Sequence, residues 1–362
     1  MPLETGRRML MRGNEAIAYG ALMAGIETYY AYPITPSTEV PETFSREYGK
    51  KEWPDFKVLM QAPSEIEAIS MTIGSAAAGL KSMTFTSSPG FSLKQEGISY
   101  AAAMEIPMVI GNVSRSGPGL GNIAAEQSDY WQATKGGGHG GYRLIVLAPS
   151  TVQEIAVFPS LAFDLAFKYR TPVVIMTDAF TGQLKEDIIF PPIEKKTYDT
   201  SWALTGAKDR NRRVLNSFFL EADEMEMFSN RLHGKWTKIA AKEVRFDEWE
   251  CEDADVVVVA YGLPARIAKD AVKQLRREGI SVGILRPQTL WPFPKKRLSM
   301  LGKASKKFLI AELNHGQMIE DVKNAMADVG PVVVESLNRC GGNYFSVEQT
   351  KTAIRSLACK SA

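Results

Sequence analysis

Apolar residues along the chain follow two spacings in turn, one typical of amphipathic helices and the other of buried strands. From Asn14 onward helical periods alternate with short β-branched runs, and each unit of strand plus helix spans about 30 residues. The expected strands are 28–32, 57–61, 82–87, 107–113, 144–147 and 172–177, and the expected helices are 14–24, 36–48, 64–79, 92–104, 127–134 and 150–169. This spacing predicts an α/β fold with a parallel sheet covered by helices on both faces.

The alternation is interrupted over residues 191–250, a polar segment rich in Lys, Arg and Glu. Within it, residues 221–244 predict one long amphipathic helix. The alternation resumes at "DADVVVVAYG", with expected strands 281–285, 308–311 and 332–335 and expected helices 264–277, 317–327 and 347–357. The pattern therefore predicts a first domain over 1–190, a connector over 191–250 and a smaller second α/β domain over 251–362.

The charge balance and the hydropathy exclude two classes of partner. A net charge of +2 gives the chain no field that would gather nucleic acid or an anionic membrane surface. No apolar run approaches the roughly 18 residues that a membrane-spanning helix needs. We therefore expect neither a nucleic-acid partner nor a membrane partner.

The residues that form disulfides or bind soft metals are scattered along the chain. They are Cys251, Cys340, Cys359, His139, His233 and His315. Because the sequence contains no CxxC pair, we expect no disulfide framework, no iron–sulfur site and no protein-bound metal within this chain. Few, widely spaced cysteines fit a reducing cytoplasm, which is the expected location.

The loop "YPITPST", residues 32–38, follows the first expected strand. Ligands of open parallel sheets bind beyond the carboxyl ends of strands. Thr35 is placed to cap a helix whose first residue is Pro36. Capping does not explain Pro33, which stiffens the approach, or the other hydroxyl groups at a helix N-terminus, where free N–H groups favour a carboxylate ligand. A structural cap and a ligand site are both open at this point.

The next such loop begins the segment "QAPSEIEAISMTIGSAAAGLK". Ser64 and Glu67 match the S-x-x-E capping box, so Glu67 has a structural task. Glu65 then stands in the first turn with no capping task. It is either a surface glutamate stabilised by the helix dipole or a buried carboxylate whose protonation is tuned for chemistry.

A glycine-rich loop, "SRSGPGLGN", follows the strand expected at 107–113. Its glycines do not match the dinucleotide fingerprint, because the third glycine should fall at Asn122. A nicotinamide dehydrogenase is therefore disfavoured. Arg115, at the strand end, is either a structural arginine or a bidentate clamp for a carboxylate. The segment "KGGGHGG", residues 135–141, is too flexible for a helix and is either a mobile loop over a pocket or a long connector.

Several catalytic signatures are missing from the sequence. It has no Walker motif, no "GDG" followed by an asparagine that would hold a metal–diphosphate, no G-x-S-x-G and no H-E-x-x-H. The chain thus offers a carboxylate, an arginine and a hydroxyl cluster without a phosphate cradle. These groups look like one half of an active site.

Taken together, the motifs resemble the alpha subunit of the 2-oxoacid:ferredoxin oxidoreductases. The segments that carry the resemblance are "AYPITPST", "SEIEAISMTIGSAAAG", "TSSPGFSLKQEG", "SRSGPG", "EQSDYWQATKGGGHG", "KYRTPVVIMTD" and "LRPQTLWPFP". The likeness is strongest to the 2-oxoisovalerate, or branched-chain, type, chiefly through "SDYWQATKGGGHG" and "LAFDLAFKYR". It covers nearly the whole chain.

The resemblance implies a pyrimidine-side thiamine diphosphate domain followed by a transketolase C-terminal-like domain. Glu65 would hydrogen-bond N1′ of the coenzyme's aminopyrimidine and favour its imino tautomer, and Pro33 and Ile34 would line the coenzyme. Thr35 and Arg115 would bind the carboxylate and carbonyl of the substrate. A beta subunit would supply the diphosphate and Mg²⁺ side and a [4Fe-4S] cluster, with gamma and ferredoxin-like delta subunits, ferredoxin and coenzyme A completing the system.

The implied reaction converts a 2-oxoacid to an acyl-CoA and CO₂ with reduction of ferredoxin. A branched-chain substrate needs an apolar pocket, whereas 2-oxoglutarate needs a second cation for its distal carboxylate. Lys135, His139 and Arg143 are candidates for that cation. The alternatives to a branched-chain enzyme are therefore the same chemistry on 2-oxoglutarate or pyruvate, or a non-catalytic scaffold subunit.

Overall fold

The computed structural model describes residues 5–192, 194, 196–304 and 307–359. Its strands are β1 (Arg8–Arg12), β2 (Thr28–Ala31), β3 (Val58–Gln61), β4 (Ser82–Thr86), β5 (Met108–Ser114), β6 (Ile145–Leu147), β7 (Pro172–Asp178), β8 (Lys185–Ile189), β9 (Phe246–Trp249), β10 (Val256–Ala260), β11 (Val282–Pro287), β12 (Thr289–Trp291), β13 (Lys307–Glu312) and β14 (Val333–Asn338). Its helices are α1 (Gly13–Met23), α2 (Glu39–Glu47), α3 (Glu65–Ala77), α4 (Ser88–Leu93), α5 (Gln95–Ala103), α6 (Val152–Tyr169), α7 (Ala179–Gln183), α8 (Ala222–Lys242), α9 (Gly262–Arg277), α10 (Lys295–Ala304), α11 (Met318–Met326) and α12 (Val347–Cys359), with a π-helical turn at Gln132–Gly136.

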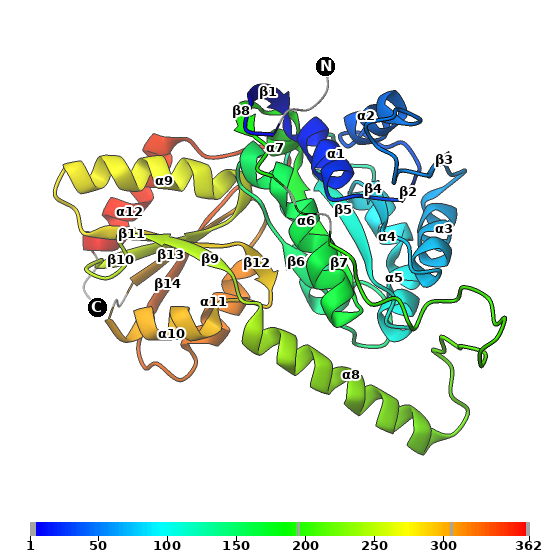
Figure 1. Cartoon of the computed structure of the whole chain (residues 1–362). Coiled ribbons are helices and arrows are strands. Elements are labelled where there is room, and N and C mark those ends of the chain that lie inside the picture. Colours follow the sequence, from blue (N-terminus) through cyan, green and yellow to red (C-terminus); the bar gives the residue numbers. More distant parts are fainter. Residues whose placement is uncertain (1–4, 193, 195, 305–306, 360–362) are drawn as a thin grey trace.

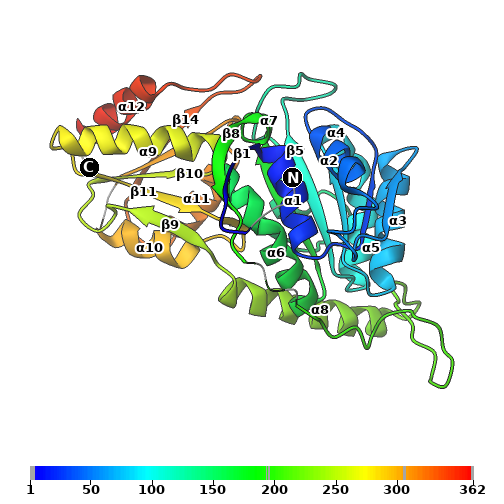
Figure 2. The same ribbon diagram turned by 45° about the horizontal axis from the view of Figure 1, so that its top comes forward.

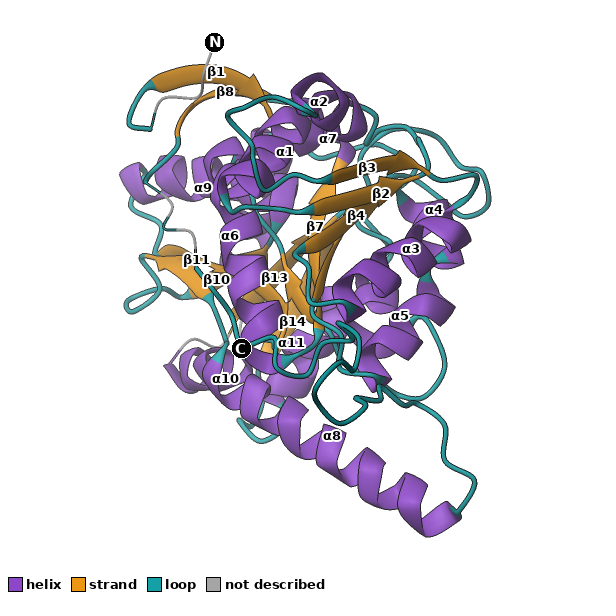
Figure 3. Cartoon of the chain, turned by 45° about the vertical axis from the view of Figure 1, so that its right-hand side comes forward, coloured by secondary structure: helices purple, strands orange, loops and turns teal. Residues whose placement is uncertain are grey.

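The first half of the chain forms a seven-stranded sheet in the order β12-β6-β7-β5-β4-β2-β3. All neighbours pair in parallel except β12, which is antiparallel to β6. Helices α1 and α6 lie on one side of this sheet, and α3, α4 and α5 lie on the other (Figure 1, Figure 3). Strands β4, β5 and β7 are buried along their whole length, as near-continuous apolar runs in a doubly covered sheet require. The predicted α/β fold is confirmed.

The second half forms a five-stranded sheet in the order β14-β13-β10-β11-β9. Its inner strand β10, with the sequence VVVVA, is fully buried and pairs in parallel with both neighbours. Helices α9 and α12 pack together on one face, and α10 and α11 cover the other (Figure 1). These elements start and end within a few residues of the bounds expected from the sequence.

Two short strands connect the parts of the chain in a way that the sequence did not predict. Strand β12 belongs to the C-terminal part but joins the N-terminal sheet, where Thr289 pairs with Leu147. Strand β9, at the end of the connector, pairs with β11 of the second sheet. Neither segment has the apolar run of the predicted strands, because β9 contains Asp247 and Glu248 and β12 lies between Pro287 and Pro292. Their pairing depends on segments that are distant along the chain.

The connector contains the predicted long helix, α8, which extends along the molecule from the second sheet to a projecting loop (Figure 2). Only three of its residues, Leu232, Trp236 and Ile239, are buried. They recur at helical spacing, so α8 attaches to the body by one narrow stripe. No helix in the part of the chain that the structure describes has the length and apolarity needed to cross a lipid bilayer.

Three expected helices differ from the structure. The helix expected at 36–48 begins at Glu39, because the N–H and hydroxyl groups of Ser37 both bond to the carbonyl of Ile34 and close a turn before it. Thr35 is therefore not a helix cap, and this prediction was wrong. The helix expected at 92–104 is two helices, α4 and α5, that meet at Lys94. The helix expected at 127–134 is helical only from Tyr130 and continues as a π turn to Gly136.

Gln127 joins the two sheets through a buried set of hydrogen bonds. Its backbone N–H donates to the carbonyl of Leu313 at 2.8 Å, and its side-chain oxygen accepts from the Leu313 N–H at 3.0 Å. Its side-chain nitrogen donates to the carbonyl of Tyr261 at 3.0 Å, and its own carbonyl accepts from Asn314 at 3.0 Å. One residue of the first half thus pairs with two loops of the second half.

We expect Gln127→Ala to lower the free energy of unfolding by about 2–4 kcal/mol. The change leaves the buried N–H of Leu313 without a partner, which costs about 1–3 kcal/mol. It also removes the shorter of two bonds to the carbonyl of Tyr261, which keeps only the N–H of Ala265 at 3.4 Å. Urea unfolding of the full chain measures the effect. Gln349→Ala is the control, because it removes only an exposed capping bond from the Ser346 N–H and should cost about 1 kcal/mol. An equal effect in both variants would contradict this role for Gln127.

Candidate active site

The carboxyl ends of four adjacent strands, β3, β2, β4 and β5, meet at one edge of the first sheet. The loops that follow them carry Thr35 after β2, Glu65 after β3, Ser88 after β4 and Arg115 after β5. Ala31 and Gln61 pair in register at the ends of β2 and β3, so the first two loops start side by side. The fold therefore brings together the residues that the sequence singled out, at the edge where parallel sheets bind ligands.

Glu65 is the first residue of α3 and is only 5% exposed. Ser64 caps the helix by accepting a hydrogen bond from the N–H of Ile66 at 3.2 Å, and its hydroxyl donates to the exposed carboxylate of Glu67. Glu67 thus contacts the Ser64 hydroxyl and not the Ser64 backbone N–H, so the predicted capping box is not formed, although Ser64 is the helix cap. Of the two interpretations of Glu65, the surface glutamate is excluded by its burial.

The Glu65 carboxylate lacks a protein partner among the residues described. No hydrogen-bond donor in that part of the chain contacts it, and its oxygens are not among the fully buried atoms without a partner, so they keep some access to solvent. It packs against Gly90 of α4, where a Cβ atom would lie 2.5 Å from the Glu65 Oε1 and 2.1 Å from the Thr86 Oγ1. The carboxylate is thus held by packing, and its oxygens remain available for a ligand that donates a hydrogen bond.

We expect Gly90→Ala to reduce activity more than stability. The added methyl group cannot fit between Thr86 and Glu65 without moving one of them, and such overpacking costs about 1–3 kcal/mol. Activity assays of the assembled enzyme and urea unfolding of the chain separate the two effects. Gly74→Ala in α3 is the matched control, because a Cβ there meets no atom within 4 Å. Full activity of Gly90→Ala would mean that the position of Glu65 is not critical.

Arg115 and Thr35 are in direct contact. The Arg115 Nη1 donates to the carbonyl of Thr35 at 2.7 Å, and its Nη2 donates to the carbonyl of Leu120 at 3.3 Å. Arg115 is only 7% exposed, and its Nε has no hydrogen-bond partner. The guanidinium therefore joins two loops and leaves its Nε–H donor unused.

Arg115 also lines a cavity of about 560 Å³ between the two halves of the chain. The second half contributes the loop Asn314–Gln317 and residues 340–341 to its wall, including His315 and Cys340. The floor holds Asp129, whose carboxylate accepts from Ser88 at 2.6 Å and from Asn112 at 2.8 Å. Burial raises the pKa of Asp129. Neither Thr35 nor Glu65 is among the described residues that line this cavity.

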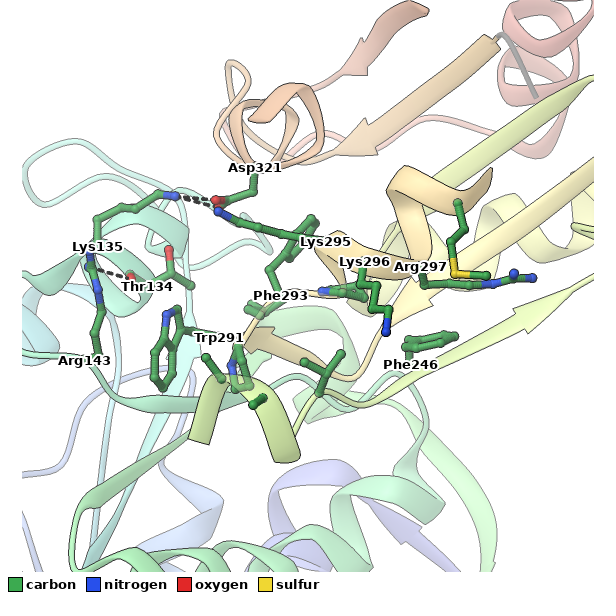
Figure 4. Close-up of a pocket in the computed structure, with 17 residues that line it drawn as sticks. Thr134, Lys135, Arg143, Phe246, Trp291, Phe293, Lys295, Lys296, Arg297 and Asp321 are labelled. Carbon is green, nitrogen blue, oxygen red and sulfur yellow. Dashed lines mark hydrogen bonds and ion pairs between the residues drawn. The ribbon is translucent and has the colours of Figure 1, made fainter. Parts of the chain in front are cut away.

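The three candidates for a second cation lie elsewhere. Lys135 donates to both oxygens of Asp321 at 2.6 and 2.7 Å, and Arg143 donates to the carbonyl of Thr134 at 3.3 Å (Figure 4). Lys135 and Arg143 line a different cavity of about 800 Å³, where α10 and α11 meet the first half. His139 packs edge-on against Tyr100, with ring centroids 5.8 Å apart. None of the three shares the Arg115 cavity in the described structure.

Three residues of this site were not predicted from the sequence. Lys94 and Gly90 contact Glu65, and Asp129 accepts a hydrogen bond from Ser88, which contacts Arg115. Two of them lie in the quoted segment "TSSPGFSLKQEG", whose apolar and small residues at the end of a strand were the available signal. Among the residues described, no group of three or more His, Cys, Asp or Glu side chains is arranged to hold a metal ion.

Comparison with known proteins assigns the family. Residues 19–243 match the model described as "Pyruvate flavodoxin/ferredoxin oxidoreductase, thiamine diP-bdg", and residues 254–350 match "Pyruvate:ferredoxin oxidoreductase core domain II". The ketoisovalerate oxidoreductase subunit VorB of Methanothermobacter thermautotrophicus is 46% identical over 354 residues, covering 96% of this chain and 97% of that protein. The chain belongs to the 2-oxoacid:ferredoxin oxidoreductase family. The resemblance stated from the motifs is confirmed, and the chain is an alpha-type subunit.

Other members of the 2-oxoacid:ferredoxin oxidoreductase family are also similar. The 2-oxoglutarate synthase subunit KorA of Methanothermobacter marburgensis is 36% identical over 373 residues, covering 94% of this chain and 96% of that protein. The structure of the 2-oxoglutarate:ferredoxin oxidoreductase from Magnetococcus marinus, with 2-oxoglutarate, coenzyme A and succinyl-CoA bound, superposes with a TM-score of 0.88 and 26% identity. That match covers 97% of this chain and 65% of the other. A split-gene transketolase, with a TM-score of 0.59 and 13% identity, shares the fold.

Proposed function

We propose that this chain is the alpha subunit of a complex that oxidatively decarboxylates a branched-chain 2-oxoacid to an acyl-CoA and CO₂ and reduces ferredoxin. The observation that supports this most directly is Glu65, a residue only 5% exposed whose carboxylate receives no hydrogen bond from the described residues, at the carboxyl edge of the sheet. Thiamine diphosphate, when bound, supplies the carbanion chemistry that breaks the bond to the leaving carboxylate. The matched family model is described as binding this coenzyme.

Glu65 is the residue of this chain that would contact the coenzyme's aminopyrimidine. A buried carboxyl group at hydrogen-bonding distance from a ring nitrogen shares a proton with it, and the packing against Gly90 fixes the direction of that bond. Pro33 and Ile34, both partly buried beside Thr35, would form the wall of the same site. The rigid proline limits the motion of this wall.

Thr35 and Arg115 would bind the oxoacid. The exposed Thr35 side chain is free of the capping task, and Arg115 holds the Thr35 backbone in place through its Nη1. The unused Nε–H of Arg115 is a charged donor in a buried setting, which suits a substrate carboxylate. Arg115 would thus orient the substrate and its threonine partner together.

A beta subunit would cover the apolar side chains around this edge. Tyr32, Ile66, Leu120 and Ile123 are 41%, 51%, 84% and 61% exposed, and they occur in the loops or first turns that follow the site strands. Exposed apolar residues gathered around a site mark a protein interface. The partner would bring the diphosphate and Mg²⁺ site and a [4Fe-4S] cluster. Gamma and delta subunits would pass electrons to ferredoxin.

The position of Lys135 and Arg143 supports a branched-chain substrate over 2-oxoglutarate. Lys135 pairs with Asp321, and both cations line a cavity other than that of Arg115. Neither Lys135 nor Arg143 would therefore pair with the distal carboxylate of an oxoacid that Arg115 holds. The higher identity to the ketoisovalerate enzyme subunit agrees with this choice.

The test is to purify the native complex, identify its subunits and measure methyl viologen reduction with coenzyme A and a panel of 2-oxoacids. We expect the highest kcat/KM with 2-oxoisovalerate. A preference for 2-oxoglutarate or pyruvate would overturn the substrate assignment but leave the chemistry intact. No reduction with any 2-oxoacid, together with no thiamine diphosphate binding in the presence of the partner subunit, would instead indicate a scaffold.

A further inference from the structure

Lys94 is completely buried at the junction of α4 and α5, beside Glu65. Its Nζ donates to the backbone carbonyl of Glu65 at 3.3 Å and to the hydroxyl of Thr84 on β4 at 3.1 Å. Lysine is rarely buried to this extent unless a carboxylate pairs with it. The contacts therefore place the Lys94 amine against the backbone of the residue proposed as the catalytic carboxylate.

The hydrogen-bonding partners of Lys94 are poor for a charged group. An ammonium group has three N–H donors, and the two acceptors found here are both neutral. Lys235 is a contrasting case in the same chain, because its ammonium donates to the Glu105 carboxylate at 3.0 Å and to the carbonyl of Arg170 at 2.9 Å. A lysine with only a structural role is expected to pair with a carboxylate, as Lys235 does, and Lys94 lacks such a pair.

The charge that faces Lys94 belongs to Glu65. Burial lowers the pKa of Lys94 to about 7, and the Glu65 carboxylate acts in the opposite direction. The other carboxylates on the surrounding helices, Glu67 of α3 and Glu96 of α5, are exposed to solvent. Strand β4 contributes the neutral hydroxyl of Thr84. Lys94 and Glu65 form no direct ion pair, so the Glu65 carboxylate acts on the buried Lys94 amine only through its charge.

We propose that Lys94 is a positioning residue for Glu65, anchoring the first peptide of α3 through the Glu65 carbonyl and attracting the Glu65 carboxylate with its positive charge. This inference rests on the proposed function of Glu65. It explains why a fully buried lysine is present where an apolar side chain of the same length would fit. A residue that costs stability and supports activity is a common feature of active sites.

The stability of the chain should depend on pH through Lys94. Its pKa is about 7 in the folded chain and 10.5 in the reference state, so the unfolded chain binds more protons between these values. Stability then rises with pH across this window. The penalty from burying the ammonium is fully present below pH 7 and disappears as the pH approaches 10.5. Lys94→Met, which keeps the length and removes the charge, removes this penalty.

The decisive experiment compares Lys94→Met with the wild-type chain in two assays. In urea unfolding of the full chain, the variant is expected to be more stable at pH 6.5, with the difference shrinking by pH 9.5. In the assembled complex, kcat is expected to fall about 10- to 100-fold. The KM for the oxoacid is expected to change little, because Lys94 acts through Glu65 and not on the substrate. The wild-type kcat should fall at alkaline pH as Lys94 is deprotonated, and the kcat of Lys94→Met should not show this fall.

Two further variants keep this test falsifiable. Lys94→Met with Thr84→Val removes both partners of one hydrogen bond, so that an unpaired Thr84 hydroxyl does not obscure the stability gain. Lys235→Met breaks an ion pair and is expected to lower stability, which serves as the matched control. The inference would be overturned if Lys94→Met lowered stability both alone and together with Thr84→Val. It would also be overturned if Lys94→Met kept the wild-type kcat. If the wild-type complex itself decarboxylates no 2-oxoacid, the proposed function fails first, and the stability arm still reports on Lys94.

Discussion

Glu65→Gln is expected to leave the complex assembled and to reduce oxoacid decarboxylation by about 1,000-fold, within the range for loss of a positioned acid–base group. Glutamine preserves the size of the side chain and its packing against Gly90. It cannot exchange a proton with a ring nitrogen as a carboxyl group does. The loss should therefore appear in kcat, with the oxoacid affinity little changed.

The measurement is methyl viologen reduction by the purified complex, with size-exclusion chromatography to verify assembly. Glu67→Gln is the matched control, since it changes an exposed glutamate two residues away on the same helix. That control should keep nearly full activity. Near-normal turnover of Glu65→Gln with this artificial acceptor would refute the role assigned to Glu65.

Arg115→Ala is expected to raise the KM for the oxoacid by about 100-fold, equivalent to roughly 3 kcal/mol. Two losses combine in this variant. The substrate carboxylate loses a charged donor in a buried site, and the Thr35 and Leu120 loops lose the guanidinium that joins them. Arg115→Lys should fall between the wild type and the alanine variant, because lysine keeps the charge but not the planar fork.

Initial rates across a range of oxoacid and coenzyme A concentrations separate the possible outcomes. Thr35→Val tests the partner side chain without disturbing the bond from Arg115 to the Thr35 backbone. An unchanged KM for the oxoacid together with a changed KM for coenzyme A would assign Arg115 to the thioester step instead of substrate binding.

Long buried strands and amphipathic helices could be predicted from the sequence because their periods are local. The apolar runs of β5 and β7 each predicted a strand within one or two residues of its observed bounds. Strands β9 and β12 could not be predicted, since β9 carries Asp247 and Glu248 in place of an apolar run and β12 lies between Pro287 and Pro292. Both pair with segments far away in the sequence. Local propensity contains no information about such partners.

The candidate site, too, could be predicted only where the local order of the elements decides it. The positions of Thr35, Glu65 and Arg115 after parallel strands followed from the order of the elements. The burial of Glu65 did not, because it depends on Gly90, a residue of another helix. Lys94 was missed because a lysine within a helical stretch normally faces solvent. Packing between elements decided both cases.

The crossing of β12 into the first sheet has a consequence for dissecting the protein. A fragment that stops at residue 250 would lack Thr289–Trp291, the outermost strand beside β6. It would then present a row of unpaired backbone groups to any other chain with a free edge, a recognised cause of aggregation. The loop of Asn314 and Leu313 that pairs with Gln127 would be absent as well. The two halves should therefore be expressed as one polypeptide, and insertions are better tolerated in the projecting loop before α8 than between the sheets.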